Sequence, residues 1–343
     1  MKVSVSRLAR LACASALATV VSMGAAAAQD VVLKLHQFLP AQAPVPALVL
    51  VPWMEKITAE SGGRITFEHY PAMQLGGKPP ELIDQVTDGV ADIVWTLPGY
   101  TPGRFPRTEV IELPFLINDA ESASRALYTL GEKHMFATEY ADVKVLGMWT
   151  HGPGVIHSKT PIAAPADLAG VKLRAPTRVT NMMVTNLGAT AVGMPVPAVP
   201  ESLSKGVIDA TIIPWEVTGA LKSSELVKNH TEFAGKALYT SAFIMAMNKA
   251  VYDGLPDDLK AVIDANTGVE FSAMAGKLSQ SADDGARQMA VDMDNNIIAL
   301  TAEQSAEWEA AAKPTYDTWL KEMSDQGIDG QALLDEARAL MGQ

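Results

Sequence analysis

The spacing of hydrophobic and polar residues predicts alternating strands and helices along the first hundred residues. Residues 64–70 alternate between apolar and polar side chains, which is the two-residue period of a strand. Helical patterns occur at 45–61 and 80–88, and two further strands are expected at 31–37 and 91–97. This order of strand and helix predicts a parallel sheet with helices on both faces.

A second group of elements is expected after residue 150, where Gly152, Pro153 and Gly154 interrupt the pattern. We interpret this break as a first crossing between two lobes, and a strand at 237–247 as the return to the first lobe. The expected α/β protein divides into a lobe I at 29–152, a lobe II at 153–236, a return to lobe I at 237–275, and a spanning helix with C-terminal helices at 276–343.

Residues 1–28 have the features of a secretory signal peptide. Lys2, Arg7 and Arg10 precede an apolar run at 11–21, and small residues end the segment at Ala28. Cleavage is expected after Ala28, and the run is too short for a good membrane anchor. We therefore expect an exported protein in the periplasm.

The chain has a formal net charge of -12. Because the leader carries three positive charges and no acidic residue, the remaining chain is more acidic still, which disfavours nucleic acid and anionic membranes as partners. A local cationic site can still bind an anion inside a cleft. The only cysteine, Cys13, lies in the leader, so no disulfide is expected afterwards.

No catalytic signature is present. The sequence lacks GxSxG, HExxH, GxGxxG and GxxxxGK[ST] motifs, and its six histidines include no pair four residues apart. Such motifs mark common hydrolases, zinc sites and nucleotide sites. We therefore expect neither an enzyme nor a cofactor nor a metal site, although a periplasmic enzyme stays an alternative that turnover of a bound ligand would reveal.

Arg174 is the strongest candidate for ligand binding. It ends a short strand expected from Val171, and Pro176 follows. Open α/β sheets bind ligands at the carboxyl ends of their strands, and the guanidinium group makes two parallel hydrogen bonds to a carboxylate without losing its proton. A surface arginine paired with a nearby acid is the alternative.

The residues around Arg174 continue into a wider pattern. "DL.G.K.R.P" at 167–176 is followed by "N.G" at 186–188 and "E.L..G.IDA" at 201–210, and "PAMQLGG" occurs at 71–77. In this order and spacing the chain resembles the periplasmic solute-binding proteins of tripartite ATP-independent periplasmic (TRAP) transporters, which include C4-dicarboxylate and sialic-acid binders.

The resemblance implies a two-lobe periplasmic binding protein, type II-like, with a hinge and one long helix that spans both lobes at about 270–295. It also implies delivery of the ligand to a permease with a small and a large integral membrane subunit. We expect the protein itself to be a monomer. A ligand-sensing protein that feeds a signalling receptor is the alternative, and neighbouring genes would distinguish the two.

Two departures from the family pattern bear on the ligand. Many members carry a second arginine about twenty residues before the first, where this chain has Gly154, and many carry a small polar residue near Pro214 or Trp215. We therefore expect a small organic monocarboxylate, with an aromatic acid or a 2-oxo or 2-hydroxy acid as examples, since aromatic side chains favour an apolar remainder. A dicarboxylate is the alternative.

Seven further residues are candidates for ligand contact, each with a structural alternative. The tryptophans could instead belong to the core, Asn181 could cap a helix, and Glu216 could hold a cation beside the ligand. The candidates besides Arg174 are Trp215, Tyr100, His36, Phe38, Trp95, Asn181 and Glu216.

Overall fold

The computed structural model describes residues 30–343, and the predicted signal peptide lies outside them. The first of its two sheets has the strand order β2-β1-β3-β10-β4. β1 is parallel to β2 and β3, whereas β10 is antiparallel to β3 and β4. The strands are β1 (Val31–Gln37), β2 (Ile65–Tyr70), β3 (Ile93–Thr96), β10 (Ala242–Asn248) and β4 (Val143–Thr150).

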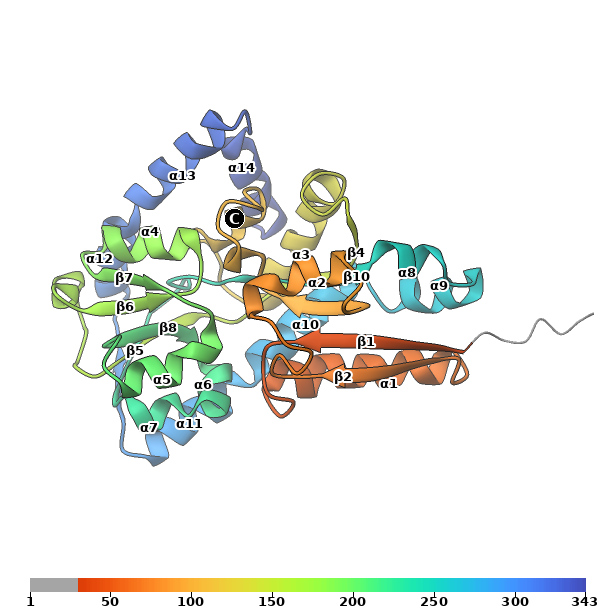
Figure 1. Cartoon of the computed structure of the whole chain (residues 1–343). Coiled ribbons are helices and arrows are strands. Elements are labelled where there is room, and N and C mark those ends of the chain that lie inside the picture. Colours follow the sequence, from red (N-terminus) through yellow and green to blue (C-terminus); the bar gives the residue numbers. More distant parts are fainter. Residues whose placement is uncertain (1–29) are drawn as a thin grey trace, which may run out of the picture.

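The second sheet has the order β11-β9-β5-β8-β6-β7. β6 is parallel to β7 and β8, β5 is antiparallel to β8 and β9, and β11 is parallel to β9. The strands are β11 (Asn296–Ala299), β9 (Asn229–Glu232), β5 (Gly154–Ser158), β8 (Ala210–Pro214), β6 (Lys172–Ala175) and β7 (Thr190–Gly193). Figure 1 shows the two sheets side by side, each the centre of one lobe.

Helices cover both sheets. Those of the first lobe are α1 (Val51–Glu60), α2 (Leu82–Thr87), α3 (Ala120–Leu130), α8 (Lys249–Asp253), α9 (Asp257–Ala265) and α10 (Val269–Ser281). Those beside the second sheet are α4 (Arg178–Asn186), α5 (Val199–Ser204), α6 (Trp215–Leu221), α7 (Ser223–Leu226), α11 (Asp283–Asp292) and α12 (Ala302–Ala312), followed by α13 (Pro314–Asp325) and α14 (Gly330–Leu340). Short 3-10 or π turns are η1 (Pro46–Leu50), η2 (Pro79–Glu81), η3 (Pro98–Tyr100), η4 (Thr108–Glu112), η5 (Gly131–Met135), η6 (Pro165–Leu168) and η7 (Val196–Ala198).

The expected spanning helix is present as two helices that meet at Ala282. α10 packs against α3 and β4 of the first lobe, and α11 packs against α6 of the second. The C-terminal helices also join the lobes, because α13 contacts α4 while α14 contacts α3. None of the helices in residues 30–343 is both long and apolar enough to span a membrane.

The two crossings between the lobes touch each other. β4 leads into β5 through His151, and the return strand begins at Ala242 because residues 237–241 form the second crossing rather than the start of a strand. Gly154 donates its backbone N–H to the carbonyl of Tyr239 at 3.0 Å. A Cβ atom on Gly154 would lie 2.0 Å from the Tyr239 ring, so this contact requires glycine.

Some boundaries differ from the sequence pattern. The apolar and polar pattern predicts a helix over 119–140, but α3 ends at Leu130 and the chain continues as the π turn η5. Phe136 folds back there, and a Cβ on Gly131 would lie 2.5 Å from its ring. Strand β11 was not expected, because it has only four residues and so short a segment shows little of the two-residue period of a strand. The division at residues 152, 236 and 275 stays a prediction.

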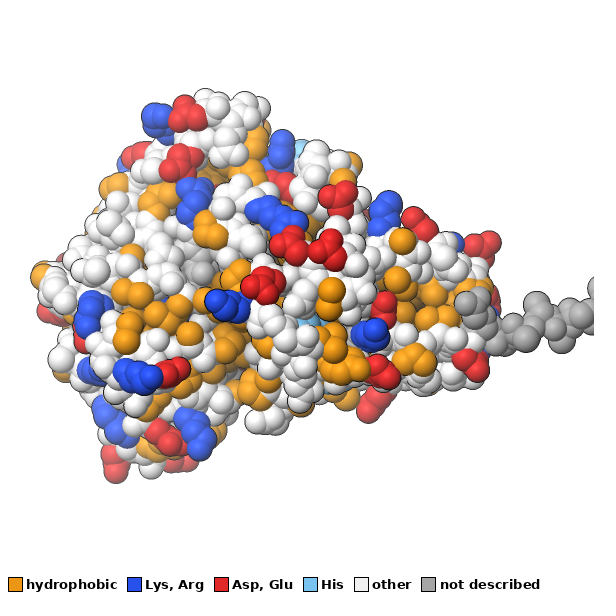
Figure 2. Space-filling model, viewed as in Figure 1, with side chains coloured by type: hydrophobic (Ala, Val, Ile, Leu, Met, Phe, Trp, Pro, Cys, Tyr) orange, Lys and Arg blue, Asp and Glu red, His pale blue; other side chains and the backbone are white. Residues whose placement is uncertain are grey.

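The surface offers no concentrated basic region on the face drawn in Figure 2. Acidic and basic side chains are interspersed there among apolar ones. The buried apolar residues of the described part of the chain form three clusters, and the largest side chains of the first cluster include Trp95 and Trp149, whose parallel rings have centroids 6.1 Å apart.

Candidate ligand-binding site

A cavity of about 380 Å³ lies where the lobes meet. This volume includes open space at the mouth of the site as well as the space between the side chains. The first lobe contributes Phe38, Leu39, Trp95, Leu97, Tyr100 and Phe243, the crossings contribute His151, Tyr239 and Ser241, and the second lobe contributes Arg174, Pro176, Val196, Ile213, Pro214, Glu216 and Val217. The cavity thus contains five of the eight residues predicted from the sequence.

Arg174 extends from β6 into this cavity and is 1% exposed. Its Nε and Nη2 atoms donate to the carbonyl of Met194 at 2.9 and 2.8 Å, and Nη1 donates to the carbonyl of Ile212 at 3.1 Å. These bonds hold the guanidinium plane in one orientation. Among residues 30–343, no carboxylate lies within ion-pair distance of Arg174, although burying a lone cation is costly.

Neutral polar side chains line the same cavity as Arg174. The Nε2 atom of His151 accepts a hydrogen bond from the backbone N–H of Ser241 at 3.0 Å, and Nδ1 lies 2.6 Å from the carbonyl of Gly152. This pattern requires the proton on Nδ1. Burial lowers the pKa of His151 to about 4, so the ring is uncharged near neutral pH. The buried hydroxyl of Ser241 has no partner within the described part of the chain.

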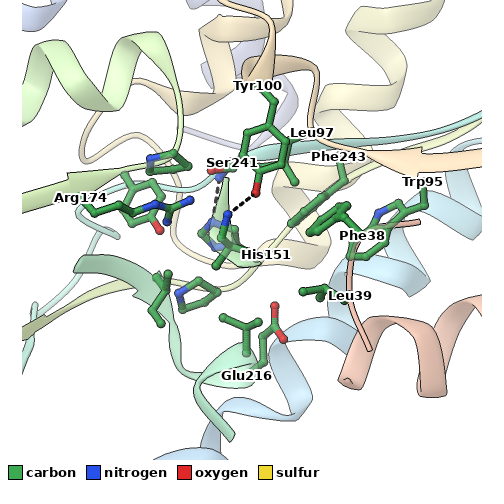
Figure 3. Close-up of a pocket in the computed structure, with 16 residues that line it drawn as sticks. Phe38, Leu39, Trp95, Leu97, Tyr100, His151, Arg174, Glu216, Ser241 and Phe243 are labelled. Atoms are coloured by element: carbon green, nitrogen blue, oxygen red, sulfur yellow. Dashed lines mark hydrogen bonds between the residues drawn. The ribbon is translucent and has the colours of Figure 1, made fainter. Parts of the chain in front are cut away.

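Aromatic rings form the opposite end of the cavity (Figure 3). The rings of Phe38 and Trp95 stack with centroids 4.7 Å apart, and Phe243 lies 5.1 Å from Trp95. Tyr100 contacts Phe38 edge-on at 5.8 Å. The site therefore combines one polar end with one flat, apolar end.

Glu216 enters the cavity from the first turn of α6 and is 4% exposed. Its backbone N–H donates to Oδ1 of Asp283 at 2.8 Å, but its buried Oε2 atom has no partner among the described residues. Burial, and secondly the Asp283 carboxylate, raise the pKa of Glu216 well above its ordinary value.

Three predicted residues lie outside the cavity. Trp215 packs against both His157 and His230 and donates its indole N–H to Glu232 at 2.9 Å. Its side chain leaves the strand end on the side away from the cavity, because α6 begins at this residue and turns Glu216 inward instead.

His36 and Asn181 have structural roles. His36 Nδ1 lies 2.7 Å from Oε1 of Gln85, so the ring faces α2. Asn181 donates to the carbonyl of Thr177 at 2.6 Å, which stabilises the start of α4, while Thr177 is the residue that caps the helix.

The cavity also contains three residues on the crossings that were not predicted from the sequence, which are His151, Tyr239 and Ser241. The break at residues 151–154 was the available signal, since it was interpreted as a crossing and a crossing between lobes lies at the base of their cleft. Within residues 30–343, no group of three His, Cys, Asp or Glu side chains has the arrangement of a metal site.

Comparison with known proteins agrees with this architecture. The family model described as "Bacterial extracellular solute-binding protein, family 7" matches residues 37–322. The C4-dicarboxylate-binding periplasmic protein of Rhodobacter capsulatus is 26% identical over 78% of this chain and 80% of its own length.

Two solved structures are more similar. A TRAP solute-binding protein from Rhodoferax ferrireducens T118, in complex with copurified benzoate, is 48% identical with a TM-score of 0.89, covering 91% of this chain and 98% of that one. A marine metagenome TRAP solute-binding protein specific for aromatic acid ligands, in complex with 3-hydroxybenzoate, is also 48% identical with a TM-score of 0.89, covering 92% and 98%. The chain therefore belongs to family 7 of the bacterial extracellular solute-binding proteins, as a solute-binding protein of the TRAP transporters.

Proposed function

We propose that the protein captures a small aromatic monocarboxylate in the cavity between its lobes and delivers it to a TRAP permease. The observation that carries this proposal is the buried guanidinium of Arg174, which lines the cavity without an acidic partner in residues 30–343. A ligand carboxylate supplies the missing negative charge.

The hydrogen bonds of Arg174 leave room for that carboxylate. A guanidinium group has five N–H donors, and three of them are directed to the carbonyls of Met194 and Ile212. Apart from these three bonds, one N–H remains on each terminal nitrogen, with the Tyr100 hydroxyl beside the guanidinium group. These two donors suit the two oxygens of one carboxylate, and bidentate pairs of this kind are stronger than neutral hydrogen bonds.

The aromatic end of the cavity favours a flat, apolar remainder. A ring that packs against this aromatic cluster of Phe38, Trp95 and Phe243 gains apolar contact and roughly 0.5 to 1.5 kcal/mol for each aromatic pair. The two relatives at 48% identity support this choice, since they were found with benzoate and 3-hydroxybenzoate.

A dicarboxylate fits the cavity less well. Arg174 is the only Lys or Arg in the described lining, His151 is neutral, and Glu216 is an acid. The place where many family members carry a second arginine is occupied by the Tyr239 ring against Gly154. A second carboxylate would therefore lack a cation.

Delivery follows from closure of the lobes on the ligand. A ligand shifts the equilibrium between open and closed forms by its higher affinity for the closed form. Both lobes contribute to the cavity, so only the closed form surrounds the ligand fully. The closed, loaded form is the species that we expect the permease subunits to receive.

A thermal-shift screen of organic acids tests the proposal. Aromatic monocarboxylates should raise the melting temperature of the wild type, since a ligand at a hundred times its Kd adds about 2.7 kcal/mol of stability. Arg174→Met should lose this shift, and Arg174→Lys should retain a smaller one. Arg104→Met is the matched control, because Arg104 pairs with Asp84 at the surface. Stabilisation by neutral sugars and by no acid would refute the proposal.

A further inference from the structure

Glu216 is an unused polar group inside the proposed ligand site. Its carboxyl group points into the cavity in Figure 3, on the side away from the helix that carries it. No hydrogen bond to either oxygen occurs among the described residues, and Oε2 is fully buried. A buried polar group of this kind costs stability unless a partner arrives, so the group needs a separate explanation.

The neighbours of Glu216 exclude an internal partner. Leu39 and the chain neighbours Pro214 and Val217 also line the cavity and offer no side-chain donor or acceptor. The carboxylate of Asp283 on α11 accepts the backbone N–H of Glu216 and thus fixes the position of the residue rather than its side chain. The partner must come from within the cavity.

We propose that Glu216 is a second anchor of the site and binds a hydroxyl group on the ligand, at a position away from the ligand carboxylate. This inference rests on the proposed function, because it assumes that Arg174 holds the carboxylate. It adds a selectivity: hydroxylated aromatic acids are bound in preference to their unsubstituted parents.

The charge state of Glu216 favours a hydroxyl over a cation. Burial and the Asp283 carboxylate favour the protonated acid, and the other titratable groups that line the cavity are Arg174, the neutral His151, Tyr100 and Tyr239. A protonated carboxyl group has one donor and one good acceptor. A hydroxyl group has the same pair, so each can satisfy the other, whereas an ammonium group offers donors only.

Removing the ligand hydroxyl leaves the buried carboxyl group unsatisfied in the complex. Sites built to bond a hydroxyl reject the analogue without it far more strongly than apolar pockets reject an extra methylene. We therefore expect the wild type to bind either 3-hydroxybenzoate or 4-hydroxybenzoate at least about tenfold more tightly than benzoate.

Isothermal titration calorimetry with these three acids tests the inference. Glu216→Leu should weaken the preferred hydroxybenzoate about tenfold or more and leave benzoate within about threefold of the wild type, while Glu216→Gln, which still donates and accepts, should keep part of the preference. Glu201→Gln is the matched control, since Glu201 pairs with Lys205 on the surface of α5. Circular dichroism of each variant establishes that it is folded.

The outcomes separate the two proposals. Equal binding of all three acids by the wild type would overturn the role of Glu216 and leave the proposed function intact. An equal loss of affinity for benzoate and the hydroxybenzoates in Glu216→Leu would also overturn the role of Glu216 and leave the proposed function intact. Failure of the wild type to bind any of the three acids would overturn both. Tighter binding of 3-(aminomethyl)benzoate than of both hydroxybenzoates would show that the site prefers a cation, which contradicts the inference.

Discussion

The hydroxyl oxygen of Tyr100 accepts a hydrogen bond from the backbone N–H of Val196 at 3.0 Å. Tyr100 follows β3 of the first lobe and Val196 follows β7 of the second, so this bond joins the lobes directly. Both residues line the cavity. The contact therefore connects the closed arrangement of the lobes to the ligand site itself.

Replacing Tyr100 with phenylalanine tests this connection. The variant keeps the ring but leaves the Val196 N–H without its partner, which costs about 1 kcal/mol and predicts a fall in ligand affinity of roughly fivefold. Calorimetry with benzoate measures the change. Tyr70→Phe is the control, because the Tyr70 hydroxyl bonds Glu68 at the surface of the first lobe. Unchanged affinity in Tyr100→Phe would mean that the bond does not support closure.

A second link between the lobes lies outside the cavity. Arg178 at the start of α4 pairs with Glu109 of η4, its Nε lying 2.9 Å from Oε1, and also pairs with Glu322 of α13. Glu109→Gln should lower affinity about threefold, mainly through faster ligand release, since it removes one charge from a partly buried pair. Stopped-flow release of the ligand measures this rate. An unaltered release rate would assign the ion pair to static packing alone.

Gly154 is required where the crossings meet. Gly154→Ala places a methyl group 2.0 Å from the present position of the Tyr239 ring, and overpacking of this kind costs about 1 to 3 kcal/mol. We expect a lower melting temperature and weaker ligand binding, because Tyr239 lines the cavity. Gly285→Ala is the control, since a Cβ on this helical glycine meets nothing within 4 Å. Equal melting temperatures for the two variants would contradict the packing argument.

A buried histidine pair predicts acid sensitivity. Asn295 Nδ2 lies 3.0 Å from His230 Nε2, His230 Nδ1 lies 2.6 Å from His157 Nδ1, and His157 Nε2 lies 3.2 Å from the carbonyl of Ile213. In this series of hydrogen bonds each histidine ring donates from one nitrogen and accepts at the other, which is the pattern of two neutral rings. Burial lowers the pKa of His230 to about 4 and that of His157 well below its ordinary value.

The unfolded chain binds protons on these rings near pH 6.5, whereas the folded chain protonates His230 only near pH 4, and burial also lowers the pKa of His157 well below its ordinary value. Their contribution to stability is therefore complete above pH 6.5 and is lost as the pH falls toward 4, by at most about 1.4 kcal/mol per pH unit for each ring. Urea unfolding across this range should show a weaker pH dependence in His230→Gln than in the wild type. Identical pH dependence would contradict the assignment.

The α/β class and the position of Arg174 were predictable because they depend on local patterns, whereas the spanning helix was expected only from the resemblance to TRAP solute-binding proteins. Strand periodicity and the end of a strand at Pro176 were enough to place Arg174 at a cleft. Phe38 and Trp95 were placed for the same reason. Where a strand passes into a helix, the direction of a side chain depends on the axis of that helix, and a short sequence pattern does not contain this axis. Trp215 was therefore expected in the cavity, although its side chain points away from it.

Other parts of the site depend on contacts between distant segments. His36 and Phe38 lie two residues apart, yet His36 faces Gln85 of α2 while Phe38 has left the strand and lines the cavity. His151, Tyr239 and Ser241 lie on two irregular crossings that are about ninety residues apart in the chain and have no periodicity. Only the folded structure brings these residues together.

A crystal structure of the protein with benzoate would show whether Arg174 binds the ligand carboxylate. We expect both carboxylate oxygens of the ligand to accept hydrogen bonds from the terminal nitrogens of Arg174, with the ring against Phe38 and Trp95. A benzoate whose carboxylate lies elsewhere, with Arg174 bonded only to Met194 and Ile212, would contradict it.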